Sequence, residues 1–217
     1  MSSHLSTIPT AEEWQQTLAD RHGPALQAKF STSAVAVCGL GGLGSHIAST
    51  LARAGVGHLI LIDFDRVDLT NLHRQQYTAD QIGQAKTQAL ADSLRAINPY
   101  IKLTLHSTRL TEDNLLPLLQ DADIICEAFD QAEAKAMLVN GVLELLPDKY
   151  LVAASGMAGL GPANRITTRH ITNHFYLCGD GTSDIAEGIS LFAPRAMLCA
   201  AHQALAVLRI LAGETDV

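Results

Sequence analysis

The 217-residue chain has only four cysteines, and none of them forms a C-x-x-C pair. Structural zinc sites need such closely spaced thiols, and small secreted domains need many cysteines for a disulfide framework. We therefore expect reduced thiols and no zinc. Histidine ligand spacings such as H-E-x-x-H are also missing, and we assign no role to His170 and His174.

Positive charge is scarce as well, with 15 Lys and Arg against 22 Asp and Glu. A nucleic-acid backbone is bound by a surplus of cations, so we expect no nucleic-acid partner. The N-terminus lacks a basic region followed by an apolar core, and no later stretch approaches the uncharged length that crosses a bilayer. We expect a cytoplasmic protein without membrane contact.

Hydrophobic residues make up 47% of the chain and charged residues 17%, which is typical of a packed globular protein. Short apolar runs alternate with stretches of helical spacing, which predicts a Rossmann-like, doubly wound α/β sheet that is mainly parallel. We expect one domain over residues 1–217. The predicted strands are 34–38, 58–62, 101–105, 123–126 and 150–153, and the predicted helices are 42–54, 81–97, 112–119 and 131–146.

The two ends of the chain depart from this alternation. Residues 1–33 read as a helical lead-in, which Gly23 and Pro24 interrupt. Residues 156–217 begin with a glycine-rich passage and predict short antiparallel strands at 164–168 and 174–177 and a closing helix at 193–211. The acidic, glycine-containing stretch 179–188 buries little apolar surface and is our candidate for a mobile lid or a partner-docking loop.

A glycine motif, Gly39-Leu40-Gly41-Gly42-Leu43-Gly44, follows the first predicted strand and opens the first helix. Glycine lets backbone N–H groups approach a phosphate closely at such a turn. Asp63 ends the second predicted strand, where an acid commonly meets ribose hydroxyls. Together these residues predict a nucleotide site.

The residues after Asp63 distinguish ATP from a dinucleotide. Asn71, Arg74 and Gln75 supply donors for a triphosphate, and Lys86 adds a point charge for the same oxygens. A dinucleotide does not need such a polar loop. Each of these residues taken alone fits an exposed loop or a solvated helix face, but the set after a glycine motif favours ATP.

The run D-x-D-x-V-x-x-x-N-L-x-R-Q, followed by G-x-x-K, resembles the ATP site of the ThiF and MoeB adenylyltransferases, bacterial relatives of the ubiquitin-activating enzymes. The resemblance covers nearly the whole chain and is strongest to a short ThiF branch. It implies that Asp63 binds ribose, that Asp65 and Asp130 lie near the phosphates, and that Asp130 holds Mg²⁺. It also implies a homodimer in which Arg21 enters the partner's ATP site.

The resemblance implies adenylation of a small ubiquitin-like sulfur-carrier protein that ends in Gly-Gly, of the ThiS kind, in thiamine thiazole biosynthesis. Arg74, Lys86 and a metal at Asp130 would spread the charge that develops as pyrophosphate leaves. Asp130 could instead serve as a helix N-cap, and Arg21 could be an ordinary surface arginine.

Other functions stay open. The same reaction on a molybdopterin-type carrier or on a tRNA base carboxylate is one alternative, although net acidity counts against tRNA. An NAD-dependent oxidoreductase and a non-catalytic binding module are the others.

Longer relatives carry two C-x-x-C pairs for zinc, and this chain has none.

Cys178 precedes the acidic stretch, so we expect a reachable sulfur whose pKa is raised by Asp180 and Asp184, and no need for it in adenylation.

Overall fold

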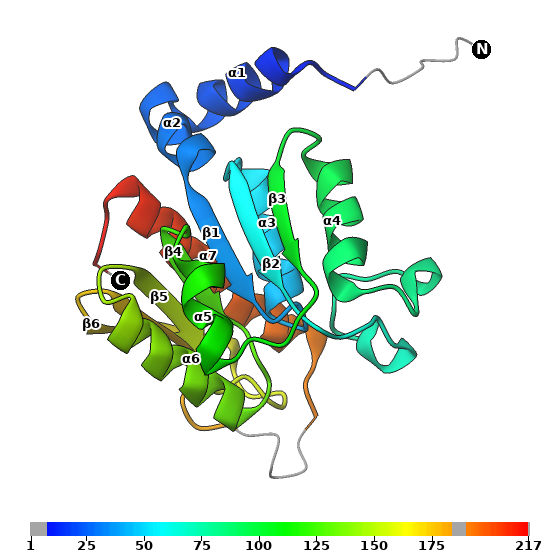
Figure 1. Ribbon diagram of the computed structural model, residues 1–217, viewed down its shortest axis with the longest axis vertical. Coiled ribbons are helices and arrows are strands. Elements are labelled where there is room, and N and C mark those ends of the chain that lie inside the picture. The colour runs from blue at the N-terminus through cyan, green and yellow to red at the C-terminus, as the bar shows by residue number, and fades with distance from the viewer. Residues whose placement is uncertain (1–7, 184–189, 217) are drawn as a thin grey trace.

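The computed structural model describes residues 8–183 and 190–216, which form one seven-stranded sheet in the order β3-β2-β1-β4-β5-β7-β6 (Figure 1). All neighbouring strands are parallel except β6 and β7. The predicted fold class is therefore confirmed. The strands are β1 (Ala34–Cys38), β2 (His58–Ile62), β3 (Lys102–His106), β4 (Ile124–Glu127), β5 (Tyr150–Ala154), β6 (Thr167–Thr172) and β7 (Phe175–Gly179).

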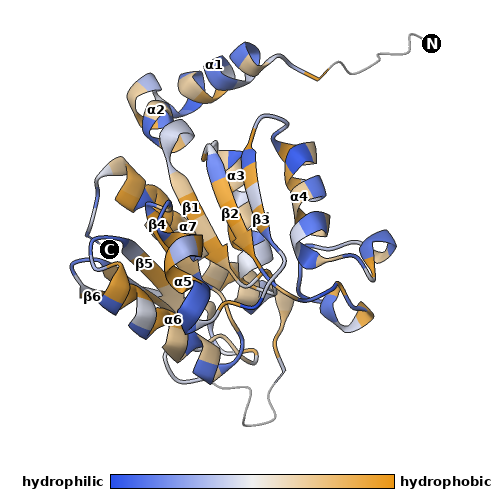
Figure 2. Cartoon of the chain, viewed as in Figure 1, coloured by the Kyte–Doolittle hydropathy of each residue, from blue (hydrophilic) through white to orange (hydrophobic). Residues whose placement is uncertain are grey.

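Helices cover both faces of the sheet because the strands are apolar on both sides (Figure 2). Val35 and Val37 of β1 belong to the core with α3 (Gly44–Ala54), α4 (Lys86–Ile97) and α7 (Ala193–Ala212). Ala36 and Cys38 point the opposite way, into the core with α5 (Glu112–Leu119) and α6 (Ala132–Leu145). Because successive side chains of a strand point to opposite faces, β1 contributes residues to both cores.

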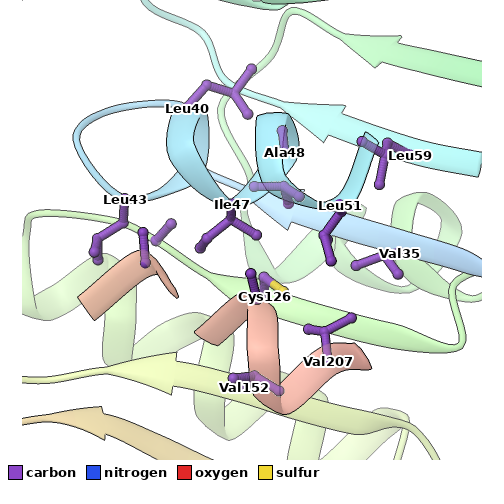
Figure 3. Close-up of a cluster of buried hydrophobic side chains, with 14 of the residues drawn as sticks. Val35, Leu40, Leu43, Ile47, Ala48, Leu51, Leu59, Cys126, Val152 and Val207 are labelled. Carbon is purple, nitrogen blue, oxygen red and sulfur yellow. The ribbon is translucent and has the colours of Figure 1, made fainter. Parts of the chain in front are cut away.

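The glycine motif and α3 share a buried apolar cluster with α7. Ile47 and Leu51 of α3 point toward Val207 of α7, with Cys126 and Val152 of the sheet beneath them (Figure 3). Ile47, Leu51 and Val207 have no exposed surface, and each such side chain contributes about 1.5–3 kcal/mol by burial.

By length and composition alone, α7 is apolar enough to cross a membrane. Arg195 and Arg209 interrupt the helix, so it contains no uncharged stretch of that length. Half of the helix's apolar window is buried within the fold, and the helix packs against α3, β5 and β7. Its apolar composition is explained by this packing.

The described part of the N-terminal segment contains α1 (Ala11–His22) and α2 (Pro24–Thr32), which are separated at Gly23. Thr10 caps α1 through a capping box with Glu13. No residue of α1 is buried, and the helix projects from the edge at which the strands begin (Figure 1).

Two predicted elements differ from the structure by more than two residues at an end. The helix predicted from residue 81 begins at Lys86, because a 3₁₀ turn at Ala79–Gln81 and the positive φ of Gly83 reverse the chain first. The strand predicted at 164–168 is displaced, because Ala163–Arg165 forms a 3₁₀ turn and β6 begins after it. Both differences come from local turn chemistry that apolar periodicity does not report.

Candidate functional site

A cavity of about 480 Å³ opens at the carboxyl ends of β1, β2, β4 and β5. The chain leaves β1 toward β2 on one side, whereas β4 lies on the other side of β1, so the cavity sits where the strand order reverses. Ligands of open α/β sheets bind at this point. The predicted site residues that line it are Gly39, Gly41, Gly42, Asp63, Asp65, Arg74, Gln75, Lys86 and Asp130.

The glycines of the motif have two different roles. Gly39 has φ +91°, and a Cβ there would lie 2.7 Å from the carbonyl oxygen of Ala128; a Cβ on Gly44 would lie 1.8 Å from that of Gly39. These two glycines let the turn close. A Cβ on Gly41 or Gly42 would meet nothing within 3.5 Å, so their absent side chains leave bare backbone facing the cavity, as a phosphate requires.

Asp63 ties the end of β2 to the glycine motif. Its carboxylate accepts hydrogen bonds from the N–H of Leu40 at 2.7 Å and from the N–H of Asp65 at 2.8 Å. Burial raises the pKa of Asp63, while nearby Lys86 and the two N–H donors oppose that rise. Each carboxylate oxygen has a second lone pair, so the group can still accept a hydroxyl from a ribose.

Lys86 is the first residue of α4, and its side chain is 7% exposed. Its Nζ lies 2.9 Å from Oδ2 of Asp65, whose side chain is 48% exposed. The backbone adds a second link, because the N–H of Lys86 donates to the carbonyl of Asp65. The two residues enter the cavity as one ion pair.

Arg74 and Gln75 leave polar atoms without a partner among the described residues. Nε of Arg74 and Oε1 of Gln75 are buried and make no hydrogen bond there. A buried, unpaired polar atom is costly unless a ligand satisfies it. These two atoms therefore fit a polar ligand such as a nucleotide.

The loop that carries Arg74 is held by α3. His46 places Nε2 3.2 Å from the carbonyl oxygen of Arg74, and its Nδ1 lies 2.9 Å from Nε2 of Gln76. Burial lowers the pKa of His46, against the effect of the hydrogen bond to Arg74. The sequence analysis did not identify His46, which lies in the first turn of α3 and outside the glycine motif.

Asn71 and Gly44 do not line the cavity formed by the described residues. Oδ1 of Asn71 instead accepts from the N–H of Asp68 at 3.1 Å, and its carbonyl accepts from the N–H groups of Arg74 and Gln75. Asn71 therefore shapes the loop that presents its neighbours.

Asp130 stands exposed at the cavity rim, just after β4. The N-cap of α6 is Gln131, so the alternative of Asp130 as an N-cap is wrong. The turn that presents it is held by Glu127, which is 1% exposed and accepts from the N–H of Phe129 at 2.7 Å. Nζ of Lys135 lies 3.0 Å from both oxygens of Glu127.

Several lining residues were missed by the sequence analysis. The guanidinium of Arg109 lies 4.0 Å from the ring centroid of Phe64, and Lys135 and Ser183 also face the cavity. Arg109 follows β3 at the same sheet edge as Asp63. The rule that carboxyl ends of parallel strands gather ligands could therefore have found it.

Arg21 is exposed near the end of α1, far from the cavity of its own chain. The N–H of Gly57, just before β2, donates to Phe30 of α2, so α2 lies where the strands begin. The cavity lies at the opposite edge, where the strands end.

The expectation of a reachable Cys178 sulfur is wrong. Cys178 has no exposed surface, and its Sγ lies 3.6 Å from Oγ1 of Thr168. Burial raises the pKa of the thiol to about 11, against the effect of the Thr168 hydrogen bond. The rise in the pKa of Cys178 therefore comes from burial, and not from the nearby carboxylates that we expected to cause it. Of the stretch 179–188, our candidate for a mobile lid or a partner-docking loop, residues 184–188 lie outside the described residues.

Comparison with known proteins gives a family match. The profile of the ThiF family matches residues 14–217. An adenylyltransferase and sulfurtransferase MOCS3 of Caenorhabditis briggsae is 39% identical over 133 residues, which cover 61% of this chain and 33% of that protein. A sulfur carrier protein adenylyltransferase of Thermus thermophilus is 35% identical over 133 residues, which cover 61% of this chain and 49% of that protein. The chain thus spans a third to a half of the length of these relatives.

Solved structures share the fold. The E. coli tRNA N6-threonylcarbamoyladenosine dehydratase TcdA, in complex with ATP, has a TM-score of 0.84 and 21% identity, covering 95% of this chain and 98% of that one. E. coli MccB has a TM-score of 0.68 and 22% identity, and the match covers 88% of this chain and 60% of that one.

Proposed function

The chain belongs to the ThiF family, and we therefore propose that it uses ATP to adenylate the C-terminal glycine carboxylate of a small ubiquitin-like sulfur-carrier protein. One observation carries the proposal: the bare backbone of Gly41 and Gly42, the cations Arg74 and Lys86, and the exposed Asp130 line one cavity.

ATP supplies the electrophilic α-phosphorus: a carboxylate oxygen bonds to it while the bond to the bridging oxygen breaks and pyrophosphate leaves. The chain's own work is to position the two reactants and to spread the developing charge. Gly41 and Gly42 offer backbone to the phosphates. Arg74 and Lys86 offer positive charge, and Asp65 holds the lysine in place.

We assign a Mg²⁺ ion to Asp130. Among residues 8–183 and 190–216, no group of three or more His, Cys, Asp or Glu side chains lies together as a metal site. Mg²⁺ commonly binds through one or two carboxylates together with substrate phosphates and waters. A single exposed carboxylate at the rim of a phosphate site fits that pattern.

A ThiS-like carrier in thiamine thiazole biosynthesis is the substrate that we favour, and the whole chain then acts as one cytoplasmic domain. A molybdopterin-type carrier is the second candidate, because the relatives include MOCS3 proteins. A tRNA base carboxylate fits less well, since the chain's net charge is −7. An NAD-dependent oxidoreductase would leave Arg74, Lys86 and Asp130 without a role.

We also propose a homodimer in which Arg21 completes the partner's site. Its position at the far edge of the sheet rules out a contact with the cavity of its own chain. An exposed helix that buries none of its residues is a suitable arm for reaching a second subunit.

The test is exchange of labelled pyrophosphate into ATP, with Mg²⁺ and each of three partners: a ThiS-like carrier, a molybdopterin-type carrier and a tRNA. Exchange that depends on the ThiS-like carrier is the expected result. Tight binding of NAD without exchange for any partner would overturn the proposal.

A further inference from the structure

Arg195, in the first turn of α7, is buried and joins three segments of the chain. Its Nη1 donates to the carbonyl of Gly161 at 2.7 Å and to that of Pro162 at 3.2 Å, and Nε donates to the carbonyl of Met157 at 3.4 Å. Its Nη2 donates to Oδ2 of Asp180. The side chains of Arg195 and Asp180 are 6% and 7% exposed.

Asp180 gathers the turn after β7 around the same ion pair. Its carboxylate accepts from the N–H groups of Thr182 and Ser183, each at 2.9 Å, and from Oγ of Ser183. Burial would raise the pKa of Asp180, but the hydrogen bonds from Ser183 and Thr182 and the charge of Arg195 together lower it to about 2. The carboxylate is thus charged at neutral pH.

The neighbouring backbone is shaped to this pair. A Cβ on Gly156, which has φ +82°, would lie 2.2 Å from Oδ1 of Asp180, and a Cβ on Gly161 would lie 3.1 Å from Nη1 of Arg195. Glycine is therefore favoured at these two positions because the backbone packs directly against the Arg195–Asp180 ion pair.

Stability alone explains this arrangement poorly. A cation in the first turn of a helix opposes the helix dipole, and a buried ion pair often contributes no more than apolar side chains of the same volume. What the pair does provide is a defined position for the segments that it joins. Met157 and Ser183 of those segments line the cavity, together with Gly156, Ala158 and Ala196.

These residues form the wall of the cavity contributed by the segment after β5, the turn after β7 and the start of α7, which we call the acyl wall. The residues that we assign to ATP come from other segments. They are held by other hydrogen bonds, from the N–H of Leu40 to Asp63 and from Nζ of Lys86 to Asp65. Loss of the Arg195–Asp180 pair would therefore disturb the acyl wall and leave the nucleotide residues in place.

We propose that Arg195 and Asp180 are positioning residues that hold the acyl wall, and thereby set the KM for the carboxylate substrate and leave ATP binding nearly unchanged. This inference rests on the proposed adenylation for the identity of that substrate.

The test compares two variants that break the pair differently. Asp180→Asn keeps the shape and removes the charge; Arg195→Lys keeps the charge but loses the planar fork that reaches several carbonyls. Each should raise the KM for the carrier at least about tenfold, because a displacement of about 1 Å at a reacting group can cost on the order of a hundredfold. The KM and Kd for ATP should change by less than about twofold on the same reasoning.

Arg209→Lys is the matched control, since Arg209 lies on the same helix and pairs with the exposed residues Glu214 and Asp216. It should leave both KM values unchanged. Equal changes in the KM for ATP and for the carrier, or no change in either for a folded Asp180→Asn protein, would overturn the inference.

A readout without any substrate separates this inference from the proposed function. In Asp180→Asn and in Arg195→Lys, backbone amides of residues 156–161 and 181–183 should exchange hydrogen faster than in the wild type, with those of α3 and α4 unchanged. If the wild type fails to exchange pyrophosphate but this pattern holds, the proposed function is wrong and the positioning role stands. Uniform acceleration over the chain would show a general loss of stability and would overturn it.

Discussion

Nζ of Lys86 lies 2.9 Å from Oδ2 of Asp65, and this pair joins the start of α4 to the end of β2. The lysine is almost fully buried, whereas the carboxylate is half-exposed at the mouth of the cavity. The lysine is thus held at the cavity by a partner that solvent still reaches. A bound phosphate can share this cation with Asp65.

Lys86→Met should therefore lower pyrophosphate exchange at least about a hundredfold, the scale of one lost preorganised electrostatic contact. The thermal midpoint should change little, because the unpaired Asp65 can be hydrated. Arg95→Met is the control: Arg95 lies on the same helix, half-exposed, and pairs only with Asp92 among the described residues. Normal exchange in Lys86→Met would remove the lysine from the site.

Asp130→Ala and Arg74→Ala should each lower exchange at least about a hundredfold for the same electrostatic reason. Asp130 does not cap α6, so its removal should leave the thermal midpoint nearly unchanged. Raising Mg²⁺ should partly restore Asp130→Ala if its defect is metal binding. Glu133→Gln, in the first turn of α6, serves as the control. An Asp130→Ala protein that melts early and retains activity would assign Asp130 a structural role.

Arg21 acting in the partner's site predicts rescue between two inactive proteins. Arg21→Ala mixed with Asp130→Ala should recover about a quarter of wild-type exchange per subunit, because half of the dimers are mixed and one site in each is complete. Arg74→Ala mixed with Asp130→Ala is the matched control: both residues line the same cavity, so no site becomes complete. Absence of rescue despite confirmed subunit exchange would exclude the trans role.

Cys178→Ser should keep exchange within about twofold of the wild type, since adenylation needs no thiol and the buried sulfur reaches no solvent. A thiol reagent should label native Cys178 only after unfolding in urea. Because burial raises the thiol pKa to about 11, labelling of the native protein at pH 8 should be slow. Rapid labelling of Cys178 in the folded protein would contradict its burial.

Acid should weaken the Arg195–Asp180 pair. The pKa of Asp180 is lowered from 3.8 to about 2 in the folded protein, so its contribution to stability is present above about pH 4 and is lost as the pH falls toward 2. That contribution is on the order of 2 kcal/mol. In urea unfolding, the stability difference between wild type and Asp180→Asn should therefore shrink between pH 5 and pH 2. The exposed Asp216→Asn should show no such trend, and a constant difference for Asp180→Asn would contradict the linkage.

Local patterns selected residues that the structure brings together at one cavity. Gly39 and Gly44 stand where a Cβ would strike backbone, and this requirement is visible in the glycine spacing itself. Asp63 and Asp130 follow strands that apolar runs had indicated. The family and the fold class predicted from these residues are confirmed.

Patterns among near neighbours predict the strands, the glycine turn at the cavity and the edge of the sheet where polar residues gather, because these features depend on local residues and on a period of two or 3.6 residues. The folded chain was needed to show that Asn71 faces its own loop, that Cys178 is buried and that Arg195 meets Asp180. Such contacts join segments that are distant along the chain. A residue's place in a periodic pattern specifies the face that it occupies; which side chain it meets there is decided by the packing of one element on another.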